Sequence, residues 1–377
     1  PAAATTATMP RRTEAEAATE AAQNVHTARL VGILPERVAN VSAPDFPYHY
    51  PLDPSSSSAH APQVHAPLQL RITRLSPYRI EFDLIGVDAS IANALRRTLI
   101  AEVPTVAIEH VYVFNNTSIV QDEVLAHRLG LVPLDIPPHV LNFKGPDDEG
   151  NDTNTVVFYL DATCTRNEAA KKGETDPEKL YNNASVTSSQ LSWSPRGGQE
   201  EDFGGHQLRP VLPDILLAKL RPGQTVNLEL HCEKGIGKDH AKFSPVCPGS
   251  YRLLPKITIL PPGIPQELIP KFRKCFPEGV IGVRTNERTG EEEAYVADAR
   301  KDTVSREVLR HKEFEGLVKL DRVRDHFLFE LESSGVYAPE ALLPAAIEVM
   351  LEKIRTVRKG VDELIRRDAL QVDAMQI

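Results

Sequence analysis

The sequence predicts an α+β protein, because it contains both runs with the two-residue period of strands and segments with the longer period of helices. Apolar residues alternate from Leu70 to Leu75 and again from Ile80 to Leu84, and Ser76-Pro77 separates the two runs. This pattern predicts a β-hairpin with one buried face. Over 88–103, and over about 339–370, apolar side chains recur every three or four residues, which predicts two amphipathic helices.

The first of these helices has recognisable ends. Asp88 is a favourable N-cap, and Pro104 cannot extend the helix. One continuous face carries Ile91, Ala94, Leu95, Thr98 and Leu99. Arg96 and Arg97 lie at the edge of that face. The periodicity alone therefore predicts a helix with one buried side.

The second helix ends the chain, and its apolar residues form a single stripe. The stripe consists of Leu343, Ile347, Met350, Leu351, Ile354, Val357, Val361, Leu364 and Ile365. A helix of this length extends beyond one small core, so we expect it to pack on a partner chain.

Between the two helices, further segments are predicted from their patterns. Strands are expected at Val106–Phe114, 156–160, 224–232 and 327–331, a strand interrupted by Pro255 at 251–260, a helix at 120–131, and a helical or turn segment at 212–220. We expect 261–305 to be poor in strands. Residues 1–26 are expected to be disordered, or helical only on a partner. The proline-rich segment 30–67 predicts either an extended arm or a linker.

Composition excludes several classes of protein. The 377 residues carry a formal net charge of −9, which disfavours a protein that grips duplex phosphates over its whole surface. The four cysteines are scattered, as expected for reduced thiols in a cytosolic or nuclear protein. There is no apolar run long enough for a transmembrane helix, and no secretory signal is recognisable. A transit peptide is the sharper alternative at the N-terminus, and Glu14, Glu16 and Glu20 speak against it.

Motifs for catalysis or cofactor binding are not found. Gly235-Ile-Gly-Lys238 lacks the spacing of a phosphate-binding loop, and Asp239 would repel a phosphate. His231, Cys232, His240 and Cys247 are close in sequence, but their spacing matches no structural zinc pattern. We therefore expect no active site, no cofactor and no metal.

Three blocks resemble one protein family. Ile-Ala-Asn-Ala-Leu-Arg-Arg at 91–97 resembles the signature helix of the RNA polymerase α subunit and its eukaryotic α-like relatives. The blocks at 121–134 and 234–246 resemble the same family, and the resemblance covers roughly 65–370. The match looks closest to the larger α-like subunit shared by eukaryotic RNA polymerases I and III, of the fungal type. The segments that suggest this are 176–183, 214–223, 274–282 and 299–307.

Absent cysteines refine this resemblance. The RNA polymerase II counterpart carries a four-cysteine zinc group after the second block, whereas residues 135–160 here contain no cysteine. Some archaeal relatives hold an iron–sulfur cluster in the region that matches 261–305, where only Cys275 is present. Both differences favour the polymerase I and III subunit and argue against a cofactor.

The resemblance implies a split dimerisation domain, in which a sheet carries two packed helices. It would comprise 65–115 and 251–377, with a mostly-β second domain inserted at 116–250 and an N-terminal extension at 1–64. Its helices would pair with a smaller α-like subunit. The implied interface residues are Ile91, Ala94, Leu95, Thr98, Leu99, Ile347, Met350, Leu351 and Ile354.

The resemblance also implies a docking site for the second-largest, catalytic polymerase subunit. Its residues would be Arg96, Arg97, Lys238, His240 and Lys242. An arginine can bond carboxylates and carbonyls bidentately, which suits a fixed docking site, although solvated charges beside a buried stripe are the plain alternative. The basic residues of the terminal helix are read as a solvated face.

The implied function is non-catalytic assembly of polymerases I and III in the nucleus, including the nucleolus, in support of rRNA, tRNA and 5S RNA transcription. Small zinc-bearing subunits would be further partners, with no membrane contact and at most indirect contact with DNA. Three alternatives stay open: the RNA polymerase II counterpart, a homodimeric DNA-binding regulator, and an enzyme with an unrecognised site.

Overall fold

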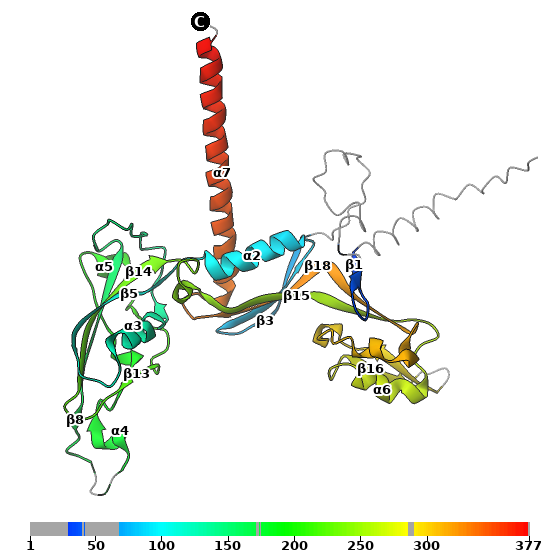
Figure 1. Ribbon diagram of the computed structural model, residues 1–377, viewed down its shortest axis with the longest axis horizontal. Coiled ribbons are helices and arrows are strands. Elements are labelled where there is room, and N and C mark those ends of the chain that lie inside the picture. The colour runs from blue at the N-terminus through cyan, green and yellow to red at the C-terminus, as the bar shows by residue number, and fades with distance from the viewer. Residues whose placement is uncertain are drawn as a thin grey trace, which may run out of the picture. The chain divides into compact units, whose positions relative to one another are not determined.

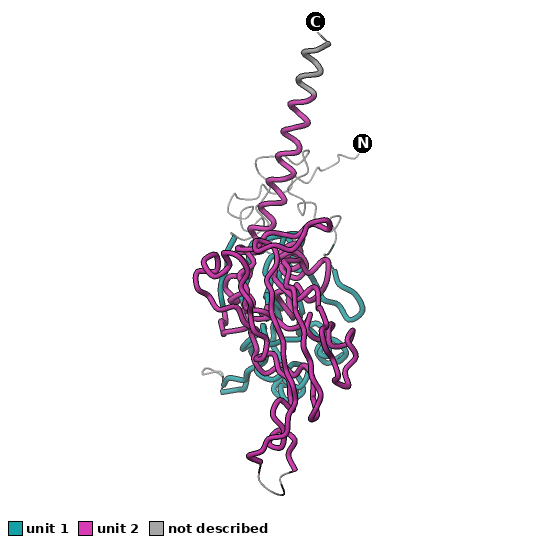
Figure 2. The backbone as a smooth tube through the Cα atoms, turned by 90° about the vertical axis from the view of Figure 1, so that its left-hand side faces the viewer, with its two compact units in different colours: residues 1–72, 82–92, 251–329 teal, residues 73–81, 93–250, 330–377 magenta. Residues whose placement is uncertain are grey.

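The computed structural model describes residues 29–39, 41, 68–170, 173, 175–285 and 290–375, and only the backbone of 368–375. It is a mixed α+β structure with several sheets (Figure 1). The predicted disorder of 1–26 and most of the predicted arm lie outside the described residues. Two compact units are distinguished in Figure 2: unit 1 holds residues up to 72, 82–92 and 251–329, and unit 2 holds 73–81, 93–250 and 330–377.

Unit 1 is built on a sheet whose strands come from distant parts of the sequence. Its strands run in the order β2-β1-β18-β4-β3, and β15 also pairs with β18. Their bounds are β1 Leu30–Ile33, β2 Val38–Ala39, β3 Gln69–Leu75, β4 Arg79–Ile85, β15 Val246–Ile259 and β18 Val318–Ser333. The predicted hairpin is thus present as β3 and β4. Strands β3, β4, β15 and β18 each continue into unit 2.

Two strands of this sheet are longer than predicted. β15 runs through Pro255 and pairs, among the described strands, with β18 alone, so the proline can take a position whose N–H is not needed. β18 extends over 16 residues, although only 327–331 is predicted. Its first half contains Lys319, Asp321 and Arg322, whose charges hide the apolar alternation.

Part of the predicted N-terminal arm is a strand. β1 pairs antiparallel with β18, with Leu30 opposite Val323 and Ile33 opposite Leu320. Leu30, Val31 and Ile33 are buried. Arg29 fixes the start of this strand, because its guanidinium bonds the carboxylate of Asp325 at 2.9 Å.

A buried carboxylate joins three segments of unit 1. Asp83 on β4 accepts two hydrogen bonds from the Arg300 guanidinium, each at 2.7 Å, and lies 3.0 Å from Nε2 of His326 on β18. Burial alone would raise the pKa of Asp83, but the hydrogen bonds from Arg300 and His326 outweigh it and hold the pKa below its usual value. The charged form of Asp83 is therefore the native one.

The rest of unit 1 follows β15 in sequence. Its core contains Phe272, Val280 and Phe314. Its elements are α6 Ile269–Lys274, β16 Ile281–Thr285, β17 Glu292–Val296, and the short 3₁₀ helices η4 Gln266–Leu268, η5 Ala299–Lys301, η6 Glu307–Arg310 and η7 Lys312–Phe314. β16 and β17 form a hairpin in a region predicted to be poor in strands. The strands are short and charged residues interrupt them, so their pattern gives little signal.

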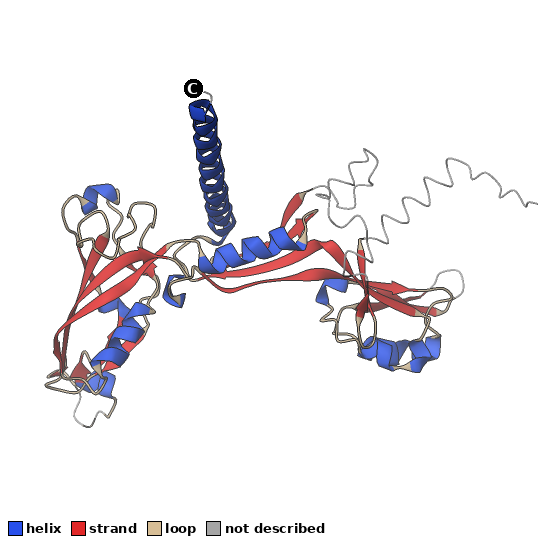
Figure 3. Cartoon of the chain, turned by 45° about the horizontal axis from the view of Figure 1, so that its top comes forward, coloured by secondary structure: helices blue, strands red, loops and turns tan. Residues whose placement is uncertain are grey.

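Unit 2 holds a second sheet, drawn with its helices in Figure 3. Its strand order is β11-β7-β14-β5, with β5 Thr105–Asn116, β7 Thr155–Thr163, β11 Ser192–Ser194 and β14 Thr225–Gly235. Helix α3, Asp122–Gly130, buries Leu125 and Leu129 in the core of this sheet. The predicted strands and helix of this segment are therefore present.

Small elements complete unit 2. They are β6 Leu134–Asp135, β8 Thr165–Arg166, α4 Pro177–Leu180, β9 Tyr181–Asn182, β10 Ser185–Thr187, η2 Ser188–Gln190, α5 Gln199–Asp202, β12 Arg209–Pro210, β13 Leu216–Lys219 and η3 Ala241–Phe243. The predicted helical or turn segment at 212–220 is a turn only at 213–214, and the rest is largely strand β13, which pairs with β10. Leu217 and Ala218 are both buried, so the strand lacks the alternation that would reveal it.

The two predicted helices are present as α2, Ala89–Ala101, and α7, Pro339–Met375. The Asp88 carboxylate accepts the backbone N–H of Ser90 at 2.8 Å, as expected of an N-cap. Near the start of α7, the hydroxyl of Tyr337 donates to the carbonyl of Pro104 at 2.8 Å. This bond ties the entry to α7 to the segment that follows α2.

The glycine-rich block at 234–246 packs on the end of α2. The backbone N–H of Lys238 donates to the Ala101 carbonyl at 2.8 Å. A Cβ atom at Gly237 would lie 2.2 Å from the Ile100 carbonyl oxygen, and one at Gly235 would lie 2.6 Å from the Phe243 ring. Glycine is therefore needed at both positions, because a side chain would collide with the end of α2 or with the Phe243 ring.

Replacing Arg300 tests the buried ion pair. We expect Arg300→Ala to lower the free energy of unfolding by about 3 kcal/mol at neutral pH, because it leaves Asp83 charged and poorly compensated. The difference from the unchanged chain should shrink as the pH falls through the lowered pKa of Asp83, because the protonated carboxyl no longer needs the guanidinium. Urea denaturation at several pH values measures both effects. The exposed pair Arg284–Glu293 supplies the control, since Arg284→Ala should cost less than about 1 kcal/mol.

Gly237→Ala tests the contact with α2. A methyl group here meets a backbone carbonyl that cannot move without disturbing the helix end, so we expect a loss of about 2 kcal/mol of stability. Gly360→Ala is the matched control: Gly360 lies in α7 with no atom within 4 Å of the added Cβ, so this change should not lower stability. Thermal denaturation of both variants compares the two sites, and equal stability would contradict the close packing of Gly237.

Candidate functional site

Most of helix α7 is left uncovered by the residues that the structure describes. Its first turns bury Leu342, Leu343 and Ala346, whereas every described side chain from 351 to 367 is exposed. Figure 2 shows the helix running away from the rest of unit 2. Seven large apolar side chains on it are between 40% and 67% exposed: Ile347, Leu351, Ile354, Val357, Val361, Leu364 and Ile365. An apolar stripe of this length on one helix marks a protein contact.

Strand β3 is a second exposed apolar surface. Leu68 and three residues of β3, namely Leu70, Ile72 and Leu75, are 50% to 70% exposed. The predicted single buried face of the hairpin is therefore wrong for this strand, although Ile80, Phe82 and Leu84 of β4 are buried. β3 is the last strand of its sheet, so among the described strands it has a neighbour on one side only. The alternation correctly indicates an apolar face, but the side chains of that face are exposed.

The interface residues predicted on α2 divide into two groups. Leu95, Thr98 and Leu99 are 7%, 3% and 0% exposed, so they already pack within their own chain. Ile91 is exposed and Ala94 is half-buried. Of the residues predicted on α7, Ile347, Leu351 and Ile354 are exposed and Met350 is half-buried. Contact with a partner stays a prediction for all nine residues.

The residues predicted for docking are also in different environments. The Arg96 guanidinium is held by the side-chain oxygen of Asn93 at 3.0 and 3.2 Å. Arg97 is exposed, and its guanidinium makes no hydrogen bond or ion pair to another described residue. Lys238 is exposed on the loop whose backbone bonds the end of α2. Its contact with α2 places this loop next to the final turn of the helix.

Lys242 has a role within its own chain. Its ammonium donates to the Ile108 carbonyl at 2.8 Å and pairs with the Glu109 carboxylate at 2.5 Å. Its side chain is only 10% exposed, so little of it is free to meet another subunit. The Nδ1 atom of His240 accepts the backbone N–H of Lys242 at 3.1 Å and shapes the same turn. The docking role of both residues stays a prediction. The ammonium of Lys242 is already engaged by the Ile108 carbonyl and the Glu109 carboxylate.

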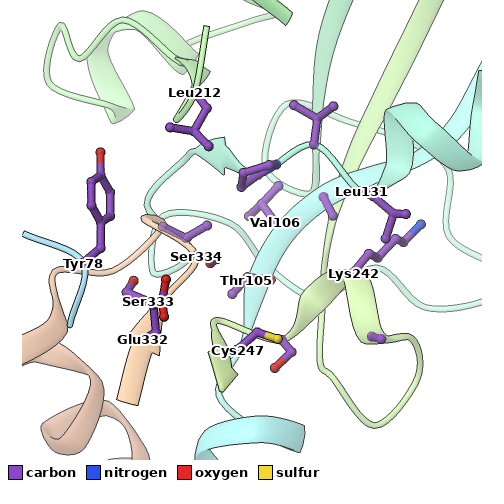
Figure 4. A pocket seen from close by; sticks show the side chains of 16 residues that line it. Tyr78, Thr105, Val106, Leu131, Leu212, Lys242, Cys247, Glu332, Ser333 and Ser334 are labelled. Atoms are coloured by element: carbon purple, nitrogen blue, oxygen red, sulfur yellow. The ribbon is translucent and has the colours of Figure 1, made fainter. Parts of the chain in front are cut away.

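A cavity of about 470 Å³ lies beside Lys242 in unit 2 (Figure 4). Its walls include Thr105, Val106, Leu131, Cys247 and Ser334. The exposed thiol of Cys247 has no histidine or carboxylate within hydrogen-bonding distance among the described contacts.

The residues considered for zinc are not gathered at one point. Cys232 is fully buried in the core of unit 2, and Nε2 of His231 lies 2.9 Å from a Glu229 oxygen. Burial also raises the pKa of the Cys164 and Cys275 thiols. Within the described ranges, no group of three or more His, Cys, Asp and Glu side chains is placed to hold a metal ion. No helix in the described part of the chain is both long enough and apolar enough to cross a bilayer.

Comparison with known proteins gives these surfaces a context. The family model described as the RNA polymerase Rpb3/Rpb11 dimerisation domain matches residues 81–354. The subunit RPAC1 of DNA-directed RNA polymerases I and III from Saccharomyces cerevisiae is 51% identical over 328 residues, which are 86% of this chain and 96% of that protein. The mouse subunit of the same description is 45% identical over 355 residues, 94% of this chain and 99% of its own length.

Relatives from RNA polymerase II are more distant. The subunit rpb3 of RNA polymerase II from Dictyostelium discoideum is 32% identical over 301 residues, 77% of this chain and 93% of that protein. The predicted preference for the polymerase I and III subunit over its polymerase II counterpart is therefore confirmed. Because the family model matches most of the length of this chain, the chain belongs to the RNA polymerase Rpb3/Rpb11 dimerisation domain family.

Proposed function

We propose that this chain is the larger α-like assembly subunit shared by RNA polymerases I and III, and that it contributes no catalytic residues to them. The observation that carries the proposal is the exposed apolar stripe of α7, which no described residue of the chain buries. A family defined by a dimerisation domain supplies a reason for that stripe. The high identity to subunits of polymerases I and III supports the choice of complex.

The proposed dimerisation domain is split, with parts at 65–115 and 251–377. Pairing of β4 with β18 in one sheet supports this division, because the two strands lie on opposite sides of the 116–250 segment in the sequence. The 116–250 segment is proposed to be an inserted domain. It is supported by a separate sheet and core that include β7, β11 and β14. Residues 1–64 form the proposed extension, of which β1 is used in the main sheet.

The proposed partner is a smaller α-like subunit that covers the α7 stripe. The exposed face of β3 is a second proposed contact surface. Each large apolar side chain that becomes fully buried contributes about 1.5–3 kcal/mol. Seven such side chains on α7 make the stripe a strong candidate for a permanent contact, which is typically large and apolar. The buried residues of α2 would then pack beneath the interface, while Ile91 and Ala94 contact the partner.

The proposed docking surface for the second-largest subunit consists of Arg97 and Lys238, with Arg96 as a neighbour. The loop that carries Lys238 bonds the last turn of α2, which supports a shared surface. We also propose contacts with small zinc-bearing subunits and at most indirect contact with DNA. The chain would act in the nucleus, including the nucleolus, in support of rRNA, tRNA and 5S RNA transcription.

Ile354→Asp tests the proposed dimer contact. Ile354 is 60% exposed, so a carboxylate there leaves the isolated chain folded but would be buried in the complex. We expect binding to the smaller α-like subunit to weaken about 100-fold or more, measured by co-expression and affinity purification. Leu95→Asp would be a poor test, because Leu95 is buried in its own chain.

The control introduces the same carboxylate on the other side of α7. Lys359 is exposed and lies away from the stripe, so Lys359→Asp should leave the pair intact. Circular dichroism should show unchanged helix content in both variants. If Ile354→Asp co-purifies with its partner as well as the unchanged chain does, the proposed interface is wrong.

A further inference from the structure

A cavity of about 550 Å³ in unit 1 is unrelated to the surfaces above. It lies between β15, β18 and the segment 301–304. Tyr251, Leu253 and Pro255 give it an apolar wall. Its volume is in the range typical of sites for small molecules, which combine such walls with a few polar groups.

The polar groups of this cavity are mostly cationic. Arg252, Lys301 and Arg322 line it, and Asp302 is the only anionic side chain among the lining residues. This local excess of positive charge stands against a net charge of −9 for the whole chain. With Asp302 ionised, the lining groups leave two positive charges that no lining residue balances. A low-dielectric cavity lined by one sign of charge concentrates ions of the opposite sign.

Arg322 and Arg252 are differently engaged. Arg322 is half-buried on β18, and its guanidinium makes no hydrogen bond or ion pair to another described residue. On β15, the Arg252 guanidinium donates to the backbone carbonyl of Asp302 at 3.0 Å and to that of Arg300. Arg252 thus anchors the 300–302 segment over the cavity, and Arg322 is the guanidinium with free donors. Lys301 is exposed and lies 3.9 Å from the Asp298 carboxylate, which is a weak pairing.

The segment that closes the cavity is held in an unusual conformation. Val304 and Arg306 have positive φ angles of 56° and 60°. A β-branched residue rarely adopts such an angle, and it persists only where its surroundings fix it. Here the Asp302 carboxylate, 3% exposed, accepts the backbone N–H of Val304 at 3.1 Å. The same buried side chain therefore shapes the turn and faces the cations.

Burial raises the pKa of Asp302, and the neighbouring Arg252 and Arg322 only partly oppose this effect. Asp302 is thus a buried carboxyl group that lies beside the cations of the lining.

We propose that this cavity binds the phosphate group of a small phosphate monoester. Arg322 would hold the phosphate oxygens bidentately, with Lys301 and the Arg252 guanidinium nearby. A phosphate monoester carries close to two negative charges at neutral pH, which balances the two positive charges that the lining residues leave with Asp302 ionised. The apolar wall would take the carbon part of the ester. A carboxylate supplies only one charge and balances the site less well.

Isothermal titration calorimetry of the full chain tests this site with three probes: glycerol 3-phosphate, inorganic phosphate and acetate. We expect one saturable site for the two phosphates and at least a tenfold weaker interaction with acetate. Arg322→Gln should weaken phosphate binding about tenfold or more. Tighter binding of the ester than of free phosphate would assign the natural source to a monoester, and equal binding would assign it to phosphate itself. Both results support a phosphate site.

The control is Arg273→Gln, because Arg273 is an exposed arginine of the same unit that does not line the cavity. It should leave phosphate binding unchanged. Three results would overturn the proposal: no saturable heat with either phosphate, binding of acetate as tight as that of phosphate, or equal weakening by Arg273→Gln and Arg322→Gln. Far-ultraviolet circular dichroism of both variants checks that the fold is retained.

Discussion

The Asp83 carboxylate is the constraint on which the main sheet of unit 1 depends. A charge that is almost fully buried must be paired, and Arg300 and His326 provide the pairing from two other segments. Because Arg300 also offers its carbonyl to Arg252, the same contact fixes the segment that covers the cavity lined by Arg322. One buried charge therefore determines where β4, β18 and the 298–306 segment meet. Apolar residues alone would allow more than one register of these strands.

Many elements of the fold could be predicted from the sequence. The hairpin and both long helices follow from apolar periodicity, and Asp88 and Pro104 give the ends of α2. The elements that were missed lack a local signal. β1 lies in a segment read as an arm, because its burial depends on pairing with β18, a contact made by residues far apart in the chain. β13 is buried without alternation.

The candidate site was only partly predictable, because periodicity identifies an apolar face without showing what covers it. Leu95 and Leu99 share the helical pattern of Ile354, yet they are buried in their own chain and Ile354 is open. The charge of Lys242 gave no indication that the Ile108 carbonyl and Glu109 would satisfy it. The local sequence shows whether a side chain is apolar or charged, but only its neighbours in the folded structure show whether it is already paired or buried.

The exposed surfaces of α7 and β3 and the cavity of unit 1 present different chemical groups, and they therefore suit different ligands. Along α7 and β3 the uncovered groups are apolar, so burial by another protein would release water from a large area and favour a lasting contact. In the cavity of unit 1 the uncovered groups are the donors of Arg322, which burial against an apolar surface would penalise. An apolar partner segment is therefore a poor occupant of that cavity, and a hydrogen-bonding anion is a good one. Binding of a partner to the apolar surface and of a small anion to the cavity should each stabilise the folded chain, because both would bind the folded state and not the unfolded one.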